Sequence, residues 1–314
     1  MNPFQALLLL SVCLIWAFHM IVIKTTVDLV PPLTYVAFRM PILALILAPL
    51  LRWHKGQMNR IMIGGACFAG FNYAFMFTGF RFTTASIGAV VMESYVVVAT
   101  VLSIVFLKEK VGWKRGAGII AALCGVLIIA TADSDATGSR NLALGATLLF
   151  LAACSEATGA LFVKTINGVK PLQMLAWFAV IGSVITGVLA AVIDTDHTAW
   201  LQSENRNAIA WALVYSVLMA SLVGHSLYYH LLQSVPLSVI APSGLLITLF
   251  AVLMGVFLLG EPLTPRMMVG ALMVVTGVAV ILVRSHAPDR KQVVAAAAAD
   301  ARDQRRPLDE QEAV

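Results

Sequence analysis

Two acidic residues lie deep inside apolar stretches of the sequence. Glu93 stands nine residues into the apolar run 84–106, and Glu156 lies inside the run 142–163. An ionised carboxylate at the centre of a bilayer costs at least about 2.5 to 3.5 kcal/mol on insertion scales, so it needs a partner, a proton or a watery cavity. Both acids are therefore candidates to bind a cationic group or a proton, since burial favours a neutral carboxyl that loads and unloads near neutral pH. The alternative is that each acid is permanently protonated, or paired with an interior base, and only fixes helix packing.

The residues around each acid are small, which indicates an interior helix face. Helical spacing places Ser86, Ala89 and Thr100 on the face of Glu93. Glu156 is surrounded by Ala152, Ala153, Gly159 and Ala160. Small and weakly polar faces pack against other helices in a membrane and do not face lipid. We therefore expect both carboxyl groups inside the protein at a similar depth.

Other polar side chains with possible chemistry lie in further apolar runs. His225 shares a helix face with Tyr228 and Tyr229, and Asn72 stands beside Tyr73. An imidazole can relay protons or contact a carboxylate, and tyrosines can stack on a ligand or donate hydrogen bonds to it. The alternative for His225 is a neutral imidazole hydrogen-bonded to a neighbouring helix.

Trp16, His19 and Arg39 lie in the first two apolar runs. Trp16 could line a cavity or serve only in packing, and His19 stands between two large apolar residues. Arg39 is seven residues into its run, about 10 Å from the start at the helical rise. It could neutralise a carboxylate of a ligand or pair with Glu93. The alternatives are that it snorkels to the interface or caps a helix end.

Cofactor chemistry has no signature in this chain. The sequence contains no Walker motif and no dinucleotide-binding fingerprint, and its four cysteines lack metal-ligand spacing. We expect no cofactor and no metal, and ATP is excluded as the direct energy source.

The composition requires a membrane around these residues. Hydrophobic residues make up 60% of the 314, charged residues only 12%, and the mean hydropathy is +0.89. A water-soluble domain of this length needs far more polar surface. Ten runs are long enough to cross about 30 Å of hydrocarbon as helices. They are placed at 4–23, 32–51, 61–80, 84–106, 113–131, 142–163, 173–193, 208–232, 237–259 and 266–284.

The charges in the short loops predict the orientation. Basic residues gather in loops on one side of the predicted bundle: Arg52, Lys55, Arg60, Lys108, Lys110, Lys114, Arg115, Lys164 and Lys170. The positive-inside rule makes that side cytoplasmic, so both termini are expected in the cytoplasm. The net charge of +5 then reflects topology, and no nucleic-acid partner is expected.

One unit occurs twice in the chain. Residues 70–130 match 222–282 at a constant offset of 152, which aligns Gly125 with Gly277 and Glu109 with Glu261, and sets Tyr73 opposite His225. Five spans per copy is an odd number, so the second copy must be inverted relative to the first. We therefore predict an all-α integral membrane protein with one five-helix repeat at 1–136, a second at 137–286, and a disordered cytoplasmic tail at 287–314.

The repeated features outside the acids are best explained as scaffold. Glu109 and Glu261 each precede a helix start, so we expect them to terminate and orient helices. The glycines at 118, 125, 270 and 277 have the spacing of one helix face, which allows close backbone approach in lipid. The fifth and tenth helices are therefore expected to form a tight contact, either between the two halves or between the subunits of a homodimer.

These residues resemble a known family. Trp16, the pair Phe38 and Arg39, and the junctions 107–110 and 259–262 are similar to the ten-span, EamA-type members of the drug/metabolite transporter superfamily, over residues 5–285. The resemblance implies a central cavity open alternately to each side, and it implies a structural or gating role for Arg39. The segment 154–156 departs from the pattern, because Glu156 stands where such proteins often carry an aromatic residue.

The resemblance and the repeat together predict the biological role. We expect a multi-pass protein of the bacterial inner membrane that exports small metabolites, such as amino acids or drugs, by alternating access. A passive channel and an intramembrane enzyme that uses Glu93, Glu156 and His225 are the alternatives. The enzyme leaves the inverted duplication without an explanation.

Overall fold

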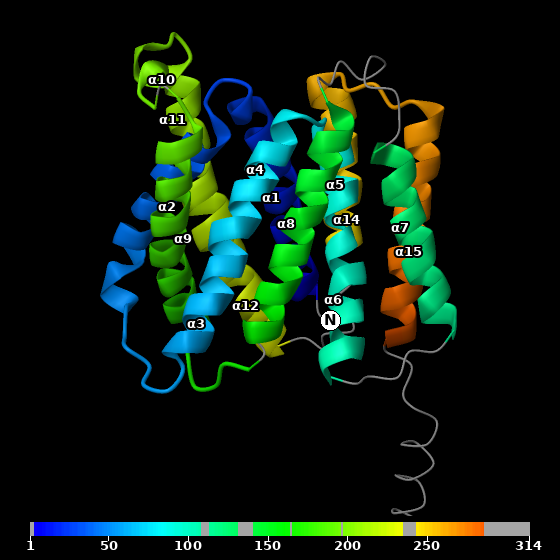
Figure 1. Ribbon diagram of the computed structural model, residues 1–314, viewed down its shortest axis with the longest axis horizontal. Coiled ribbons are helices and arrows are strands. Elements are labelled where there is room, and N and C mark those ends of the chain that lie inside the picture. Colours follow the sequence, from blue (N-terminus) through cyan, green and yellow to red (C-terminus); the bar gives the residue numbers. More distant parts are fainter. Residues whose placement is uncertain are drawn as a thin grey trace, which may run out of the picture.

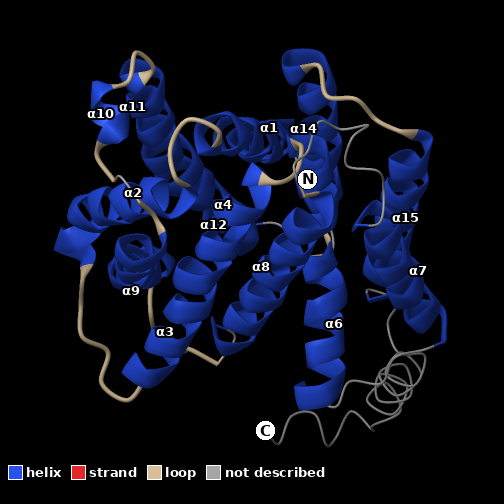
Figure 2. Ribbon diagram, turned by 45° about the horizontal axis from the view of Figure 1, so that its top comes forward, coloured by secondary structure: helices blue, strands red, loops and turns tan. Residues whose placement is uncertain are grey.

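The computed structural model describes residues 3–107, 113–130, 141–163, 165–195, 197–234 and 243–285. All regular structure in these segments is helical, and they contain no strand (Figure 2). Glu109, most of the predicted repeat junction 107–110 and the tail 287–314 lie outside the described residues.

The helices follow one another along the chain with short connections. In order they are α1 (Pro3–Val27), α2 (Pro32–Leu47), η1 (Ala48–Leu50), α3 (Met58–Gly65), η2 (Ala66–Phe71), α4 (Asn72–Arg81), α5 (Ala85–Met92), α6 (Ser94–Leu107), α7 (Trp113–Ala130), α8 (Leu142–Val163), α9 (Pro171–Ile193), α10 (Ala199–Gln202), α11 (Arg206–Val214), η4 (Tyr215–Val223), α12 (Gly224–Ser234), α14 (Ser243–Leu259) and α15 (Pro265–Ser285). Most ends agree with the predicted runs to within three or four residues.

Most of these helices have the length and the apolar composition needed to cross a bilayer. Seven helical stretches are long and apolar enough to cross a membrane, and three shorter apolar helices lie at 116–129, 243–259 and 265–280. Large apolar side chains remain exposed on the outside of the bundle, including Leu45, Val192 and Phe257 at 75%, 78% and 80%. In a helical bundle of this kind, such side chains face lipid.

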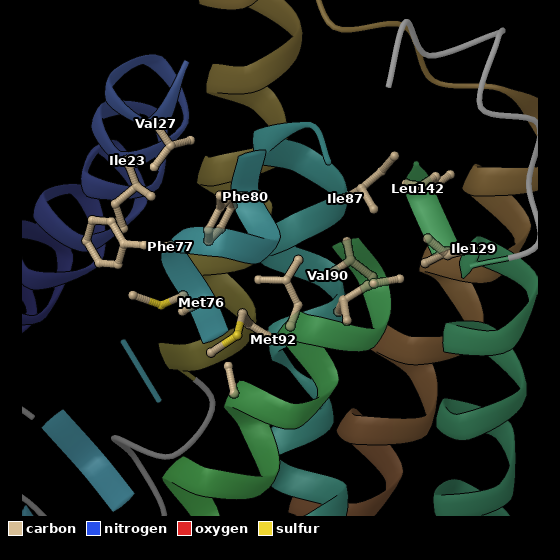
Figure 3. Close-up of a cluster of buried hydrophobic side chains, with 14 of the residues drawn as sticks. Ile23, Val27, Met76, Phe77, Phe80, Ile87, Val90, Met92, Ile129 and Leu142 are labelled. Atoms are coloured by element: carbon tan, nitrogen blue, oxygen red, sulfur yellow. The ribbon is translucent and has the colours of Figure 1, made fainter. Parts of the chain in front are cut away.

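The two ends of the bundle differ in packing. The connections 28–31, 82–84 and 203–205 lie at the end that carries α10, at the top of Figure 1. The largest apolar cluster lies mainly in the half toward this end and includes Phe77, Phe80 and Ile87 (Figure 3). Every residue of α5 is buried, whereas α6, which continues toward the opposite end, carries several exposed residues. Among the described residues, the largest set of buried apolar side chains therefore lies in the α10 half.

Helices α7 and α15 form a pair at one side of the bundle (Figures 1 and 2). A Cβ atom added to Gly125 would stand 2.6 Å from the Gly270 carbonyl oxygen, and one added to Gly277 would stand 2.6 Å from the Gly118 carbonyl oxygen. The backbones can approach this closely only because glycine has no side chain. The predicted tight contact of these helices is confirmed, and it joins the two halves of one chain.

The predicted span 84–106 is confirmed as one stretch long enough to cross a membrane over 85–102, but its α-helix is interrupted at Glu93. Helix α5 ends at Met92 and α6 begins at Ser94. At the junction, the amide of Glu93 donates to the Val90 carbonyl at 3.2 Å, and the amide of Val96 donates to the Glu93 carbonyl at 3.1 Å. These three-residue bonds tighten the turn and interrupt the α-helical ladder.

Candidate functional site

Glu93 occupies the break between α5 and α6. Its carboxylate Oε1 accepts a hydrogen bond of 2.6 Å from the Thr248 hydroxyl on α14. Gly244 lies one turn before Thr248, and a Cβ atom there would stand 3.5 Å from the same oxygen. The acid of the first half is thus bonded to a helix of the second half.

Glu156 lies on α8 and contacts the start of α4. The side-chain amide of Asn72 donates to Glu156 Oε2 at 3.3 Å and to the Ala152 carbonyl at 2.9 Å. Glu93 is close enough to Glu156 for the two carboxyl groups to interact electrostatically, as are the hydroxyls of Tyr95 and Tyr228. The structure therefore brings the two predicted acids and Asn72 together.

Neither acid has a fixed cationic partner in the described part of the chain. The single ion pair found there joins Lys24 to Asp28, at the exposed end of α1. Both acids are half-buried, and the small residues predicted on their faces, such as Ser86 and Ala152, are buried. Two neighbouring carboxyl groups with polar but uncharged contacts can accept a cation or a proton.

Aromatic side chains continue the site beside the acids. Trp16 packs edge-on against His225 with ring centroids 5.3 Å apart, and lies 5.2 Å from the ring of Tyr228. His225 Nδ1 donates to the Ser221 carbonyl at 2.9 Å, so one nitrogen is held by the backbone. Trp16 and His225, predicted from different helices, are thus in contact. Tyr229 lies in α12, but its side chain is outside the described part of the structure.

Matching stretches of π-helix precede the polar residues in both copies. Segment η2 ends immediately before Asn72 and Tyr73, and η4 ends immediately before Gly224 and His225. A π-turn widens the helix and shifts the carbonyl pattern, and such turns are frequent at functional sites. Side chains of other helices use the carbonyls: Ser155 donates to the Cys67 carbonyl at 2.8 Å, and Trp16 donates to the Ala220 carbonyl at 3.0 Å. No feature of the sequence had indicated these turns.

Arg39 is fully enclosed on α2, with 1% of its surface exposed. Its Nη2 donates to the Ser221 hydroxyl at 2.8 Å and, at 3.5 Å, to the Ser216 carbonyl. Its guanidinium carbon lies 4.9 Å from the ring centre of Tyr73 and 5.7 Å from that of Phe77. The alternatives of snorkelling to the interface and of pairing with Glu93 are both wrong, because the side chain points into the bundle and Glu93 bonds Thr248.

His19 belongs to a polar cluster in the α10 half, away from the contacts of the acids. The Ser216 hydroxyl lies 3.1 Å from His19 Nε2 and 2.8 Å from the Tyr35 hydroxyl. We refer to His19, Tyr35, Arg39, Ser216 and Ser221 as the α10-side polar cluster. It joins α1 and α2 of the first half to η4 of the second half.

Glu261 acts as a helix cap, but on a helix of the other copy. Its carboxylate accepts hydrogen bonds from the backbone amides of Ala85 and Ser86 and, at 2.6 Å, from the Ser86 hydroxyl. An anion at the first turn of α5 satisfies amides that have no partner within the helix. The predicted structural role of Glu261 is confirmed, although the sequence did not indicate which helix it would cap.

Comparison with known proteins identifies the family. The EamA-like transporter family matches the chain twice, at residues 3–131 and 143–283. The chain belongs to this family. It is accordingly a membrane transporter and not an enzyme, and the two EamA-like matches confirm the predicted resemblance.

Named relatives cover most of the chain. A protein of Escherichia coli (strain K12) named "Probable amino-acid metabolite efflux pump" is 26% identical over 284 residues, which cover 88% of this chain and 94% of that protein. A chloroplastic WAT1-related protein of Arabidopsis thaliana is 26% identical over 291 residues, covering 88% of this chain and 68% of that protein. A crystal structure with a TM-score of 0.61 and 13% identity covers 91% of this chain and all of that one, and it supports the fold alone.

Proposed function

We propose that this EamA-like protein is a secondary transporter that exports a small metabolite carrying a cationic amino group. The observation that carries the proposal is the pair Glu93 and Glu156, two neighbouring acids without a fixed cationic partner in the described segments, the first of which stands at a break between two helices. Acids in such a position mark substrate or proton sites in membrane proteins. The name of the Escherichia coli relative favours amino acids or their derivatives as the class of substrate.

The proposed topology is ten spans in two inverted five-helix repeats at 1–136 and 137–286. The seven long and three shorter apolar helices support ten spans, and the two family matches support the duplication. The equivalent positions of η2 and η4 support it further. In this topology the protein spans a bacterial inner membrane, and both termini lie on its cytoplasmic side.

The site residues divide by role. Glu93 and Glu156 would take the amino group, with Asn72 and Thr248 as the neutral donors that it displaces. Trp16 and Tyr73 would face the remainder of the substrate, and His225 would stand beside them as a hydrogen-bonding group. Tyr229 remains a candidate from the sequence alone. Broken helices that present polar groups near the midplane are the usual construction of substrate sites in transporters.

Alternating access gives the two ends of the bundle different roles. With the termini inside, the tightly packed α10 half faces outward, so this conformation is closed to the outside. Export then requires the α10-side polar cluster and the apolar cluster of Figure 3 to open after the substrate has bound. His19 and Arg39 would act in that gate.

A counterflow experiment tests the proposal. Purified protein in proteoliposomes would be loaded with unlabelled amino acids, organic acids or cationic drugs, and uptake of the labelled compound would be followed with and without a proton gradient. Saturable counterflow of an amino compound that is lost in Glu93→Gln or Glu156→Gln supports the proposal. Flux without saturation or counterflow indicates a channel, and a preference for anions unaffected by either substitution contradicts the proposed site.

A further inference from the structure

The guanidinium of Arg39 has unfilled hydrogen-bonding capacity inside the protein. Its Nε and Nη1 atoms are buried and have no hydrogen-bond partner among the described residues, while Nη2 is bonded to Ser221 and Ser216. No carboxylate in the described segments lies within ion-pair distance of it. Two donor atoms of a buried cation are therefore left unfilled by the described part of the fold.

The surroundings of Arg39 do not supply the missing negative charge. The serine contacts are neutral, and the rings of Tyr73 and Phe77 offer only the weaker attraction of aromatic faces. The imidazoles of His19 and His225 lie close enough to interact with the guanidinium, and neither can carry negative charge. Since an enclosed charge without a counter-ion is costly, an anion that binds here is stabilised strongly.

The cationic residue and the acids are linked by consecutive residues of α4. Asn72 contacts the carboxylate of Glu156, and the ring of Tyr73 lies against the guanidinium of Arg39. Successive residues on a helix point about 100° apart, so the two charged groups flank the same turn of α4. An acidic position and a basic position thus contact neighbouring residues of one helix.

We infer that Arg39 binds the carboxylate of the substrate, so that the substrate is a zwitterion whose amino group is held by Glu93 and Glu156. The inference rests on the proposed function and adds the residue that would hold the carboxylate of an amino-acid substrate. In this conformation packing encloses Arg39. The carboxylate can therefore reach Nε and Nη1 only when the α10 half loosens. Arg39 therefore discriminates in favour of a carboxylate during outward passage.

The test compares amino acids with the amines formed by removing their carboxyl group. The probe pairs are phenylalanine with phenethylamine, leucine with isoamylamine, and lysine with cadaverine. For each compound the concentration that half-inhibits counterflow is measured, together with the concentration that half-saturates thermal stabilisation of the detergent-purified protein. The decisive quantity is the ratio of the value for the amine to that for the amino acid.

The expected result is a change in that ratio alone. For at least one pair the natural protein binds the amino acid about tenfold or more tightly than the amine, as expected for hydrogen bonds to a charged group. In Arg39→Gln the ratio falls to about one, because binding of the amino acid weakens and binding of the amine does not. Arg39→Lys restores part of the ratio. Tyr35→Phe, which loosens the same polar cluster without removing its cation, keeps the ratio of the natural protein.

Other results would overturn the inference in distinguishable ways. If Arg39→Gln weakens binding of the amino acid and of the amine equally, Arg39 contributes only to packing. If the ratio is unchanged, the carboxylate is bound elsewhere. If the affinity for the amino acid requires chloride and disappears in gluconate medium, the bound anion is inorganic. Binding of amines alone contradicts the inference but leaves the proposed function standing, and binding of neither member of any pair contradicts both.

Discussion

The third spans of the two halves share a backbone feature and differ in the side chains that follow it. Both contain a π-helical segment, η2 in one and η4 in the other. The segment in the first half leads to Asn72 and Tyr73, which contact Glu156 and Arg39, whereas the segment in the second half leads to Gly224 and His225, which contact Trp16. The duplicated feature is thus one of backbone geometry, and the chemistry lies in residues that occur once.

The fourth and ninth spans show the same division. Glu93 stands at the break between α5 and α6, and the position equivalent to it at offset 152 is Leu245, in the first turn of α14. Thr248 on α14 instead supplies the hydrogen bond to Glu93. An inverted repeat provides two similar frameworks that can exchange roles between inward and outward states. Departures from the repeat are therefore where recognition of one asymmetric substrate is expected.

The largest effect is expected from a substitution in the shared framework. A Cβ atom at Gly277 would meet backbone atoms of Gly118 and Ala122 at 2.6 and 2.8 Å, and backbone cannot move aside as a side chain can. Gly277→Val should therefore separate α7 from α15 and abolish recovery of monodisperse protein in detergent size-exclusion chromatography. Gly116→Ala is the control, because it lies on α7 with nothing within 4 Å of its added Cβ. Normal recovery of Gly277→Val would contradict the framework role.

Substitution of Glu93, which has no acidic counterpart in the second copy, should remove transport and leave the fold intact. Glu93→Gln keeps the size of the side chain and its contact with Thr248, but it removes the negative charge. Loss of a charged contact corresponds to a decrease in amine counterflow of about tenfold or more. Thr248→Ala is the matched control, since it removes the neutral contact and leaves the acid. Elution volume and melting temperature should stay close to those of the natural protein.

The pH dependence of counterflow gives the same prediction a second readout. Protons compete with a cationic substrate for Glu93 and Glu156, so binding of the amine in the natural protein should weaken as the pH falls. In the double variant Glu93→Gln and Glu156→Gln this dependence should flatten. A double variant that keeps the full pH profile would assign the titration to another group.

The sequence predicted the spans and the acids because both leave local signals. Apolar length located the helices, and charge inside an apolar run located Glu93 and Glu156. It did not predict the turns at η2 and η4 or the break after Met92, because no proline or glycine marks the break and apolar residues continue through all three segments. The contacts of Glu261 with Ala85 and of Arg39 with Ser221 join residues more than 170 positions apart. Local patterns carry no information about such partners.

A smaller effect, on stability alone, is expected at the cap of α5. Glu261→Gln replaces an anion at a helix N-terminus by a neutral amide, which should lower the free energy of unfolding by about 1 to 2 kcal/mol. Glu204→Gln, an exposed acid in the 203–205 connection, should change the melting temperature little. Equal shifts in melting temperature for the two variants would show that the cap contributes no more to stability than an exposed acid on the surface.

The smallest effect should come from the hydrogen bond that holds η2. Ser155→Ala removes the contact with the Cys67 carbonyl, a single neutral bond at a half-buried position, and should cost about 0.5 to 1.5 kcal/mol. Ser216→Ala at η4 should cost more, because it removes hydrogen bonds to both His19 Nε2 and the Tyr35 hydroxyl at buried positions. Melting temperatures of the two variants in the same detergent give the order directly. If Ser155→Ala destabilised the protein as much as Ser216→Ala, the two π-helical segments would be held equally, and the difference between the halves would lie only in the side chains beyond them.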